Sequence, residues 1–229
     1  MKSKDNIIGN PPPSYKIYEQ LFNFIDNVLP VFKVKSKNKD GSLVTSEDEI
    51  TEDLADFLDI EQEALNQDQN ISFKFTNQSK KKADIGVKWG RVYAAYNRDP
   101  FCWIEAKRLP TPKDKDRDER EYVIVSQEKV NGKKKFKGNG GIQRFKEGKH
   151  APEIYYSIMI GYIQDDNNVN VWLSKINTWI IELANANNGF WGNEDCLNKY
   201  VSNKCNRFFS THKRKDKEPI TLHHYWIKL

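Results

Sequence analysis

Charged side chains interrupt two short apolar stretches of this 229-residue chain. Residues 83–87 (Ala-Asp-Ile-Gly-Val) and 101–107 (Phe-Cys-Trp-Ile-Glu-Ala-Lys) each have the β-branched or aromatic composition of a buried strand. Successive side chains of a strand point to opposite faces, so Glu105 and Lys107 share one face. Burying a carboxylate and an ammonium is unfavourable unless they are paired or bind a metal. Asp84, on the other stretch, would complete such a site.

Asp84 followed by Glu105-Ala106-Lys107 resembles the signature of the PD-(D/E)XK nuclease superfamily, to which many restriction endonucleases belong. Ala83 stands where that family often has proline. The resemblance implies hydrolysis of phosphodiester bonds with Mg²⁺, for which Mn²⁺ is a substitute. Asp84, Glu105 and the backbone carbonyl of Ala106 would bind the metal, and Lys107 would position or activate the attacking water. The alternative is an exposed ion pair between Glu105 and Lys107 at a sheet edge.

A further candidate ligand lies at the start of a predicted helix. Ser46 and Glu49 have the spacing of a capping box, which indicates that the helix begins here. Glu47 falls on the same side of this helix as its apolar residues, whereas Glu49 and Glu52 point away. The resemblance implies a carboxylate from the first core helix beside the metal, and Glu47 is the candidate, with Glu52 in reserve. The alternative for Glu47 is a first-turn glutamate that favours the helix dipole.

A glycine-rich segment, residues 138–141, opens a short predicted helix over residues 142–146. Backbone N–H groups at such a helix start can bind a phosphate. The resemblance implies that Gln143 lines the site as a catalytic residue. The alternative is an ordinary surface helix with solvated charges. The candidate phosphate contacts here are Arg144, Lys146 and Lys149.

The C-terminal part of the chain predicts two strands around a turn at residues 213–219. Its Ser-x-His-x-Arg segment contains His212 and Arg214 and is followed by an Ile-x-Leu-x-His strand. This pattern is similar to the end of some standalone, defence-associated members of the superfamily. His212 and Arg214 are therefore candidate phosphate contacts, with a structural hairpin as the alternative. A Ser-His-Asp catalytic triad is not predicted, because no serine lies in a nucleophile-elbow pattern.

Charge, cysteine content and hydropathy indicate which kinds of partner and compartment suit this protein. The net charge of +5 suits an anionic partner. Residues 133–137 (Lys-Lys-Lys-Phe-Lys) are predicted as a basic loop that either touches a phosphate backbone or is simply solvated. The three cysteines lack CxxC spacing, which argues against a disulfide framework or a zinc ribbon and favours a reducing cytoplasm. No apolar stretch has the length of a membrane span.

The predicted order of elements is helix, helix, three strands, helix, strand, helix and a β-hairpin. This order favours an α/β fold with a central mixed β-sheet flanked by helices. We expect one domain over residues 1–229, with a flexible tail at residues 1–13 and a short strand at residues 122–125. The resemblance implies a restriction endonuclease-like α-β-β-β-α-β core with an added N-terminal helix and a C-terminal β-hairpin.

The leading interpretation is a Mg²⁺-dependent endonuclease acting on DNA, in restriction or phage defence. The resemblance makes DNA the expected partner, and it allows a homodimer and a partner subunit of a defence system. Two alternatives stay open at this point. One is a non-catalytic nucleic-acid-binding or scaffold protein on the same fold, and the other is an RNA-cleaving relative.

Overall fold

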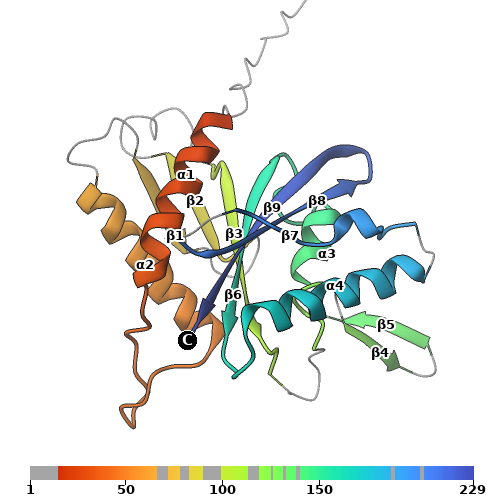
Figure 1. The fold of residues 1–229 in the computed structure, drawn as a ribbon, viewed down its shortest axis with the longest axis horizontal. Coiled ribbons are helices and arrows are strands. Elements are labelled where there is room, and N and C mark those ends of the chain that lie inside the picture. The colour runs from red at the N-terminus through yellow and green to blue at the C-terminus, as the bar shows by residue number, and fades with distance from the viewer. Residues whose placement is uncertain are drawn as a thin grey trace, which may run out of the picture.

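A seven-stranded mixed sheet, a separate two-stranded sheet and four α-helices make up the described part of this α/β protein, which is a computed structural model (Figure 1). None of the described helices is long and apolar enough to cross a membrane. The predicted N-terminal tail lies outside the described residues. These are residues 15–65, 72–77, 83–89, 99–112, 119–124, 126–130, 133–137, 140–186, 189–201 and 204–229.

The helices and strands follow one another nearly as the sequence predicts. The helices are α1 (Tyr15–Val28), α2 (Glu47–Leu65), α3 (Gly141–Lys146) and α4 (Val169–Asn185), with short 3-10 turns η1 (Leu29–Val31) and η2 (Asn193–Asp195). The strands are β1 (Phe73–Asn77), β2 (Ile85–Trp89), β3 (Cys102–Leu109), β4 (Ser126–Val130), β5 (Lys133–Lys137), β6 (Tyr156–Ile163), β7 (Asn198–Lys199), β8 (Asn206–Arg214) and β9 (Lys217–Lys228).

The main sheet has the strand order β1-β2-β3-β6-β9-β8-β7. Strands β1, β2 and β3 pair antiparallel, whereas β3, β6 and β9 run parallel at its centre. The predicted C-terminal hairpin, β8 and β9, is therefore built into the sheet, because β9 lies between β6 and β8. Its strands also extend further than predicted, and Arg214 already pairs with Lys217 across the turn.

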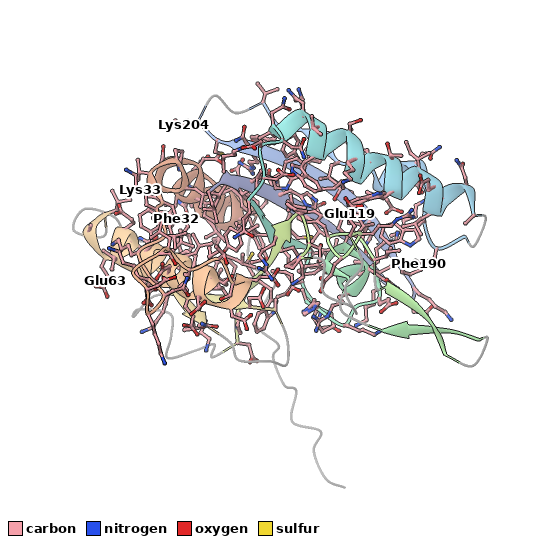
Figure 2. All side chains as sticks on the ribbon, turned by 90° about the horizontal axis from the view of Figure 1, so that it is seen from below. Phe32, Lys33, Glu63, Glu119, Phe190 and Lys204 are labelled. Carbon is pink, nitrogen blue, oxygen red and sulfur yellow. The ribbon has the colours of Figure 1, made fainter. Side chains whose placement is uncertain are left out.

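Alternation along β3 divides the apolar residues between two cores. Cys102, Ile104 and Ala106 belong to the core shared with α1 and α2. Trp103 and Leu109 belong to the core shared with α3 and α4 on the opposite face. Side chains fill the layers on both sides of the sheet when the molecule is seen from below (Figure 2). The strand pattern predicted from the sequence is thereby confirmed, and it sends the odd-numbered residues of β3 toward α3.

Two predicted local structures differ from the observed ones. Residues 122–124 form a turn, not a strand, and residue 125 lies outside the described residues. The carbonyls of Glu121, Tyr122 and Val123 accept hydrogen bonds from the first three amides of α3 instead of pairing with a strand. Residues 133–137 are not a loop but strand β5, which pairs antiparallel with β4 in a separate two-stranded sheet.

Candidate active site

Asp84 and β3 meet at one end of the β2–β3 pair. The antiparallel register pairs Ile85 with Ile104, so Asp84 lies just beyond the last paired position. One Asp84 carboxylate oxygen accepts a hydrogen bond of 2.8 Å from the backbone N–H of Ala106. This bond ties Asp84 to the residue between Glu105 and Lys107. The structure thus brings the three residues of the sequence signature together.

The ammonium of Lys107 occupies the centre of the cluster. Its Nζ lies 2.8 Å from Glu47 Oε1 and 3.1 Å from Glu105 Oε1. It also donates to the carbonyl oxygen of Ala106 at 2.7 Å. These three oxygens belong to residues that the resemblance assigns to the metal. They surround a cation, which here is the side chain of a buried lysine.

The Glu47 side chain enters the cluster from the first turn of α2. Ser46 caps this helix as predicted, since its Oγ accepts a hydrogen bond from the Glu49 N–H at 3.3 Å. The second Glu47 oxygen accepts from the Arg108 N–H at 3.0 Å, which fixes the carboxylate against β3. Glu52 is exposed. Glu47 is therefore the residue of α2 that joins the site, because it lies on the side of the helix that faces β3. The reserve candidate Glu52 lies on the exposed side.

Burial and mutual charge shift the pKa values of this cluster. Burial raises the pKa of Glu105 to about 7 although Lys107 opposes that change, and the Asp84 charge raises it further. Burial likewise raises the pKa of Asp84. Burial alone would lower the pKa of Lys107, but the carboxylates of Glu105 and Glu47 outweigh it, so its pKa is raised. The lysine therefore stays charged, while Glu105 can exchange a proton near neutral pH.

His150 is a neighbour of Glu105 that the sequence did not reveal. Its Nε2 lies 3.9 Å from Glu105 Oε2, which is too long for a hydrogen bond. Both ring nitrogens and Glu105 Oε2 are buried without a hydrogen-bond partner among the described residues. Burial lowers the pKa of His150 to about 3, and the charges of Arg144 and Lys107 add to this shift. The imidazole is therefore neutral beside the carboxylate.

The basic and amide residues around α3 take different positions. Arg144 Nη1 lies 3.7 Å from Glu105 Oε1, and its side chain is partly exposed, so it reaches both the cluster and solvent. The Gln143 amide donates to Glu147 at 2.8 Å. Lys149 is exposed and pairs with the same glutamate at 2.6 Å. Of these residues, Arg144 is the one that the structure places against the predicted metal ligands.

The start of α3 does not offer a phosphate cradle. The amides of Gly141, Ile142 and Gln143 donate to the carbonyls of residues 121–123 at 2.9 to 3.1 Å. These N–H groups are the ones that a helix start would otherwise present to an anion. The phosphate-binding role expected for the glycine-rich segment is therefore not supported by its hydrogen bonds.

Lys146, His212 and Arg214 point into the protein instead of toward a ligand. Lys146 is buried and pairs with both carboxylate oxygens of Asp195, at 2.8 and 2.9 Å. Arg214 donates to the carbonyls of Ala151 and Glu218, at 2.9 and 2.6 Å, and so holds a turn. His212 is fully buried. The structural hairpin describes His212 and Arg214 better than the role of phosphate contacts does. Lys146 is buried, so it also differs from the solvated surface charge of the alternative.

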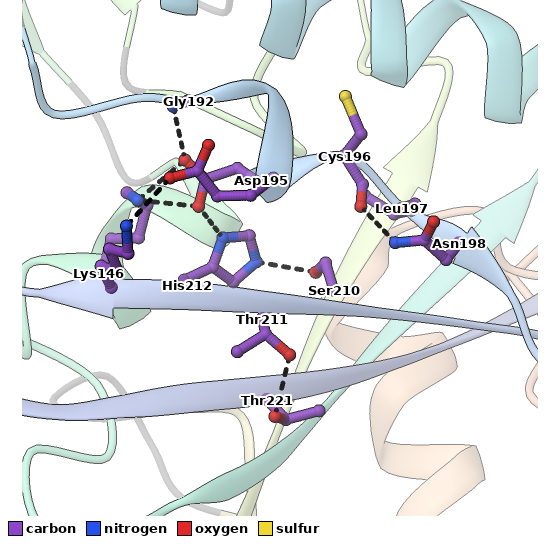
Figure 3. Close-up of polar contacts among 12 residues, drawn as sticks. Lys146, Gly192, Asp195, Cys196, Leu197, Asn198, Ser210, Thr211, His212 and Thr221 are labelled. Atoms are coloured by element: carbon purple, nitrogen blue, oxygen red, sulfur yellow. Dashed lines mark hydrogen bonds and ion pairs between the residues drawn. The ribbon is translucent and has the colours of Figure 1, made fainter.

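His212 belongs to a buried chain of hydrogen bonds. Figure 3 draws the end of this chain that contains Asp195, His212 and Ser210. Its Nδ1 lies 2.7 Å from Asp195 Oδ1 and its Nε2 lies 2.7 Å from Ser210 Oγ. Ser210 Oγ also lies 2.8 Å from Nε2 of His224, whose Nδ1 lies 2.9 Å from the Tyr122 hydroxyl. That hydroxyl accepts a hydrogen bond from the indole N–H of Trp226 at 3.0 Å.

Burial lowers the pKa values of His212 and His224, so both imidazoles are neutral. The indole N–H of Trp226 can only donate and the Asp195 carboxylate can only accept, so with neutral imidazoles every group between them donates toward the carboxylate. Ser210, His212 and Asp195 have the order of a catalytic triad, which the sequence did not predict. Ser210 is fully buried, however, and its oxygen is already shared with His224, so no substrate reaches it.

Substituting Asp195 by asparagine is expected to lower the free energy of unfolding by about 3 kcal/mol, because it leaves the buried ammonium of Lys146 without a counter-charge. Urea unfolding would measure the loss. The control is Glu194→Gln in the same turn, where an exposed carboxylate pairs with exposed Lys213 at 3.4 Å, and a change below about 0.5 kcal/mol is expected. Equal effects in the two variants would contradict the prediction.

The donor set of the cluster fits a hard cation, since carboxylate and carbonyl oxygens are the ligands that Mg²⁺ prefers. The buried and unpartnered oxygen of Glu105 also leaves a coordination site free. Among the described residues, however, no group of three or more His, Cys, Asp or Glu side chains is arranged to hold an ion. The Lys107 ammonium is what the oxygens now surround, so a divalent ion would have to share them with it or displace it.

The chain was compared with protein-family models, with curated proteins and with solved structures, and none of them matches it.

Proposed function

We propose that this chain is a metal-dependent endonuclease that hydrolyses phosphodiester bonds of DNA. The observation that carries the proposal is the convergence of Asp84, Glu105 and Lys107 with Glu47 from α2. Buried charges are unfavourable for stability, and clusters of buried carboxylates with shifted pKa values are most often found at functional sites. The resemblance to PD-(D/E)XK nucleases assigns a reaction to this set of residues.

The order of elements also supports the proposal. Helix α2, strands β1 to β3, helix α3 and strand β6 follow the α-β-β-β-α-β order that the resemblance implies for the nuclease core. The β4–β5 hairpin is inserted between β3 and α3. Helix α1 precedes this core, and β7 to β9 extend its sheet. The restriction endonuclease-like core is thus part of the proposal, and the α/β sheet is the fold on which it rests.

Asp84, Glu105, Glu47 and the Ala106 carbonyl would hold Mg²⁺ or Mn²⁺. When bound, such an ion polarises the phosphate and stabilises the leaving oxygen. Lys107 keeps a positive charge beside Glu105 and can orient the attacking water. Arg144 adds a second positive charge on the solvent side of Glu105, where it can attract a phosphate.

The simplest test is nicking of supercoiled plasmid. We expect cleavage with Mg²⁺ or Mn²⁺ and none in EDTA. A parallel assay with an RNA of matched sequence separates a DNA-cleaving from an RNA-cleaving enzyme, because cleavage of RNA alone would assign the activity to RNA. The proposal fails if neither nucleic acid is cut with any divalent ion. The test should include protein concentrations high enough to favour a dimer, since cutting both strands can require two copies.

One observation favours a second candidate, which is a non-catalytic nucleic-acid-binding protein. Lys107 already supplies the positive charge that balances Glu47 and Glu105, and the described residues hold no preformed group of three metal-binding side chains. A binder would retain duplex DNA in EDTA and yield no nicks with metal. A partner subunit from a defence system and a cytoplasmic site of action are further parts of the nuclease proposal.

A further inference from the structure

A two-stranded β-ribbon stands apart from the main sheet. Strands β4 and β5 pair antiparallel over five positions, from Ser126 with Lys137 to Val130 with Lys133, and form their own sheet. Figures 1 and 2 show this ribbon projecting from the body of the protein. In the chain it connects β3, which carries Lys107, to α3, which carries Arg144. The ribbon is therefore anchored at both ends to elements of the candidate site.

The ribbon carries most of the positive charge of the protein. Residues 126–137 contain five lysines and one glutamate, which gives a net charge of +4 against +5 for the whole chain. The remaining 217 residues are therefore nearly balanced. A protein whose excess charge is concentrated on one projecting element directs that element toward an anion.

Lysine occupies four of the five positions of β5, and Lys129 of β4 is the cross-strand partner of Lys134. Because successive residues of a strand alternate between its two faces, this sequence pattern predicts positive charge on both faces of the ribbon. Like charges on both faces and along the edge oppose pairing with a second copy of the ribbon. They suit a partner that presents negative charge on two sides.

Duplex DNA presents such a partner. Its major groove is about 12 Å wide, lies between two phosphate backbones and admits a two-stranded β-ribbon. A strand of five residues spans roughly 17 Å, which is enough to follow the groove across several base pairs. The major groove of A-form RNA is too deep and narrow for protein side chains to read. The shape of the ribbon therefore distinguishes between the two duplexes.

We propose that the β4–β5 ribbon is a DNA-binding arm that enters the major groove and contacts the phosphates on both of its sides. This inference deepens the proposed function, since it names B-form duplex DNA as the substrate class, but it concerns binding and not cleavage. It can therefore be tested in EDTA, where no cutting occurs.

The test compares two triple substitutions with equal change of charge. The arm variant replaces Lys133, Lys134 and Lys135 by glutamine. The control replaces Lys213, Lys215 and Lys217, at the tip of the β8–β9 hairpin, by glutamine. Fluorescence anisotropy with a duplex of about 20 base pairs, in EDTA, gives the dissociation constant at several salt concentrations. Removing three phosphate contacts should reduce the slope of log K against log salt by about 2 to 3.

We expect the arm variant to bind the DNA duplex at least about tenfold more weakly at about 100 mM salt, and the control to stay within about threefold of wild type. An RNA duplex of the same sequence should bind wild type more weakly and lose little in the arm variant. Methylation of guanine N7, which lies in the major groove, should interfere with binding. Equal salt slopes for the arm variant and wild type would overturn the proposal, as would equal losses on DNA and RNA.

The outcomes separate this inference from the proposed function. Loss of binding in the arm variant, in a protein that never nicks DNA, would support the arm and refute the nuclease. Nicking by wild type, with an arm variant that binds normally, would refute the arm and leave the nuclease intact. Circular dichroism and urea unfolding of both variants would show that the main sheet is unchanged.

Discussion

Replacing Lys107 by alanine is expected to reduce plasmid nicking by about a thousandfold, while binding of duplex DNA in EDTA changes by less than about threefold. The reason is that Lys107 is the buried positive charge held by the oxygens of Glu47, Glu105 and Ala106. In the proposed reaction its removal takes away the group that faces the phosphate, while the outer surface of the protein is unchanged. Gel analysis of nicked plasmid over time measures the first effect, and fluorescence anisotropy measures the second.

The same substitution leaves two carboxylates without their shared counter-charge, so a second variant is needed to separate chemistry from folding. Glu105→Gln keeps the size of the side chain and resembles its protonated form, which is accessible because its pKa lies near 7. We expect a similar loss of nicking in a folded protein. The control is Lys33→Ala, an exposed lysine after α1 (Figure 2), which should cut like wild type. A folded Glu105→Gln variant with wild-type nicking would refute the assignment.

Acidification is expected to destabilise the protein strongly below pH 6.5, because its four histidines are all buried. Burial lowers the pKa of His223 to about 3, and Arg207 beside its Nδ1 adds to the shift. Burial also lowers the pKa values of His212 and His224. Unfolded histidines have a pKa near 6.5 and bind protons first, so this stability is present above pH 6.5 and is lost as pH falls toward 3.

The expected size is about 1.4 kcal/mol per pH unit for each histidine whose pKa in the folded protein lies far below 6.5, so that His150, His223 and His224 together account for up to about 4 kcal/mol per pH unit. Glu105 acts in the opposite direction, because its raised pKa favours the folded state at low pH. Urea unfolding at pH 7.5, 6.5 and 5.5 in EDTA measures the net slope. In His223→Asn the side-chain oxygen can accept from Arg207 without titrating, and the slope should be shallower by about 1 kcal/mol per unit. An unchanged slope would contradict the prediction.

The sequence predicted those parts of the site that depend on local periodicity. Strand alternation placed Glu105 and Lys107 on one face, and helical spacing turned Glu47 toward the core. Both depend on residues close together in the chain. The proximity of Asp84 was predicted from two neighbouring buried stretches and from the resemblance that they carry, and the structure shows that their strands pair antiparallel. The confirmed geometry concerns where these side chains lie, and their chemistry stays a prediction.

The parts that the sequence did not reveal depend on contacts between distant segments. His150 reaches Glu105 only because α3 folds back over β3. Lys146 and His212 are polar residues that are expected at the surface. Both are buried because each pairs with Asp195, which lies in a separate turn. The position of β9 beside β6 arises from pairing between segments far apart in the chain. A one-dimensional pattern carries no signal for any of these contacts.

The lysine held between Glu47 and Glu105 acts as a counter-ion that cannot diffuse away. A protein that relies on a free ion to neutralise buried acids unfolds when the ion is chelated. Here the chain carries its own cation, so the acidic groups stay assembled at any concentration of magnesium. In the proposed nuclease, folding and metal loading would thereby be uncoupled, and binding of a divalent ion would compete with a tethered amine.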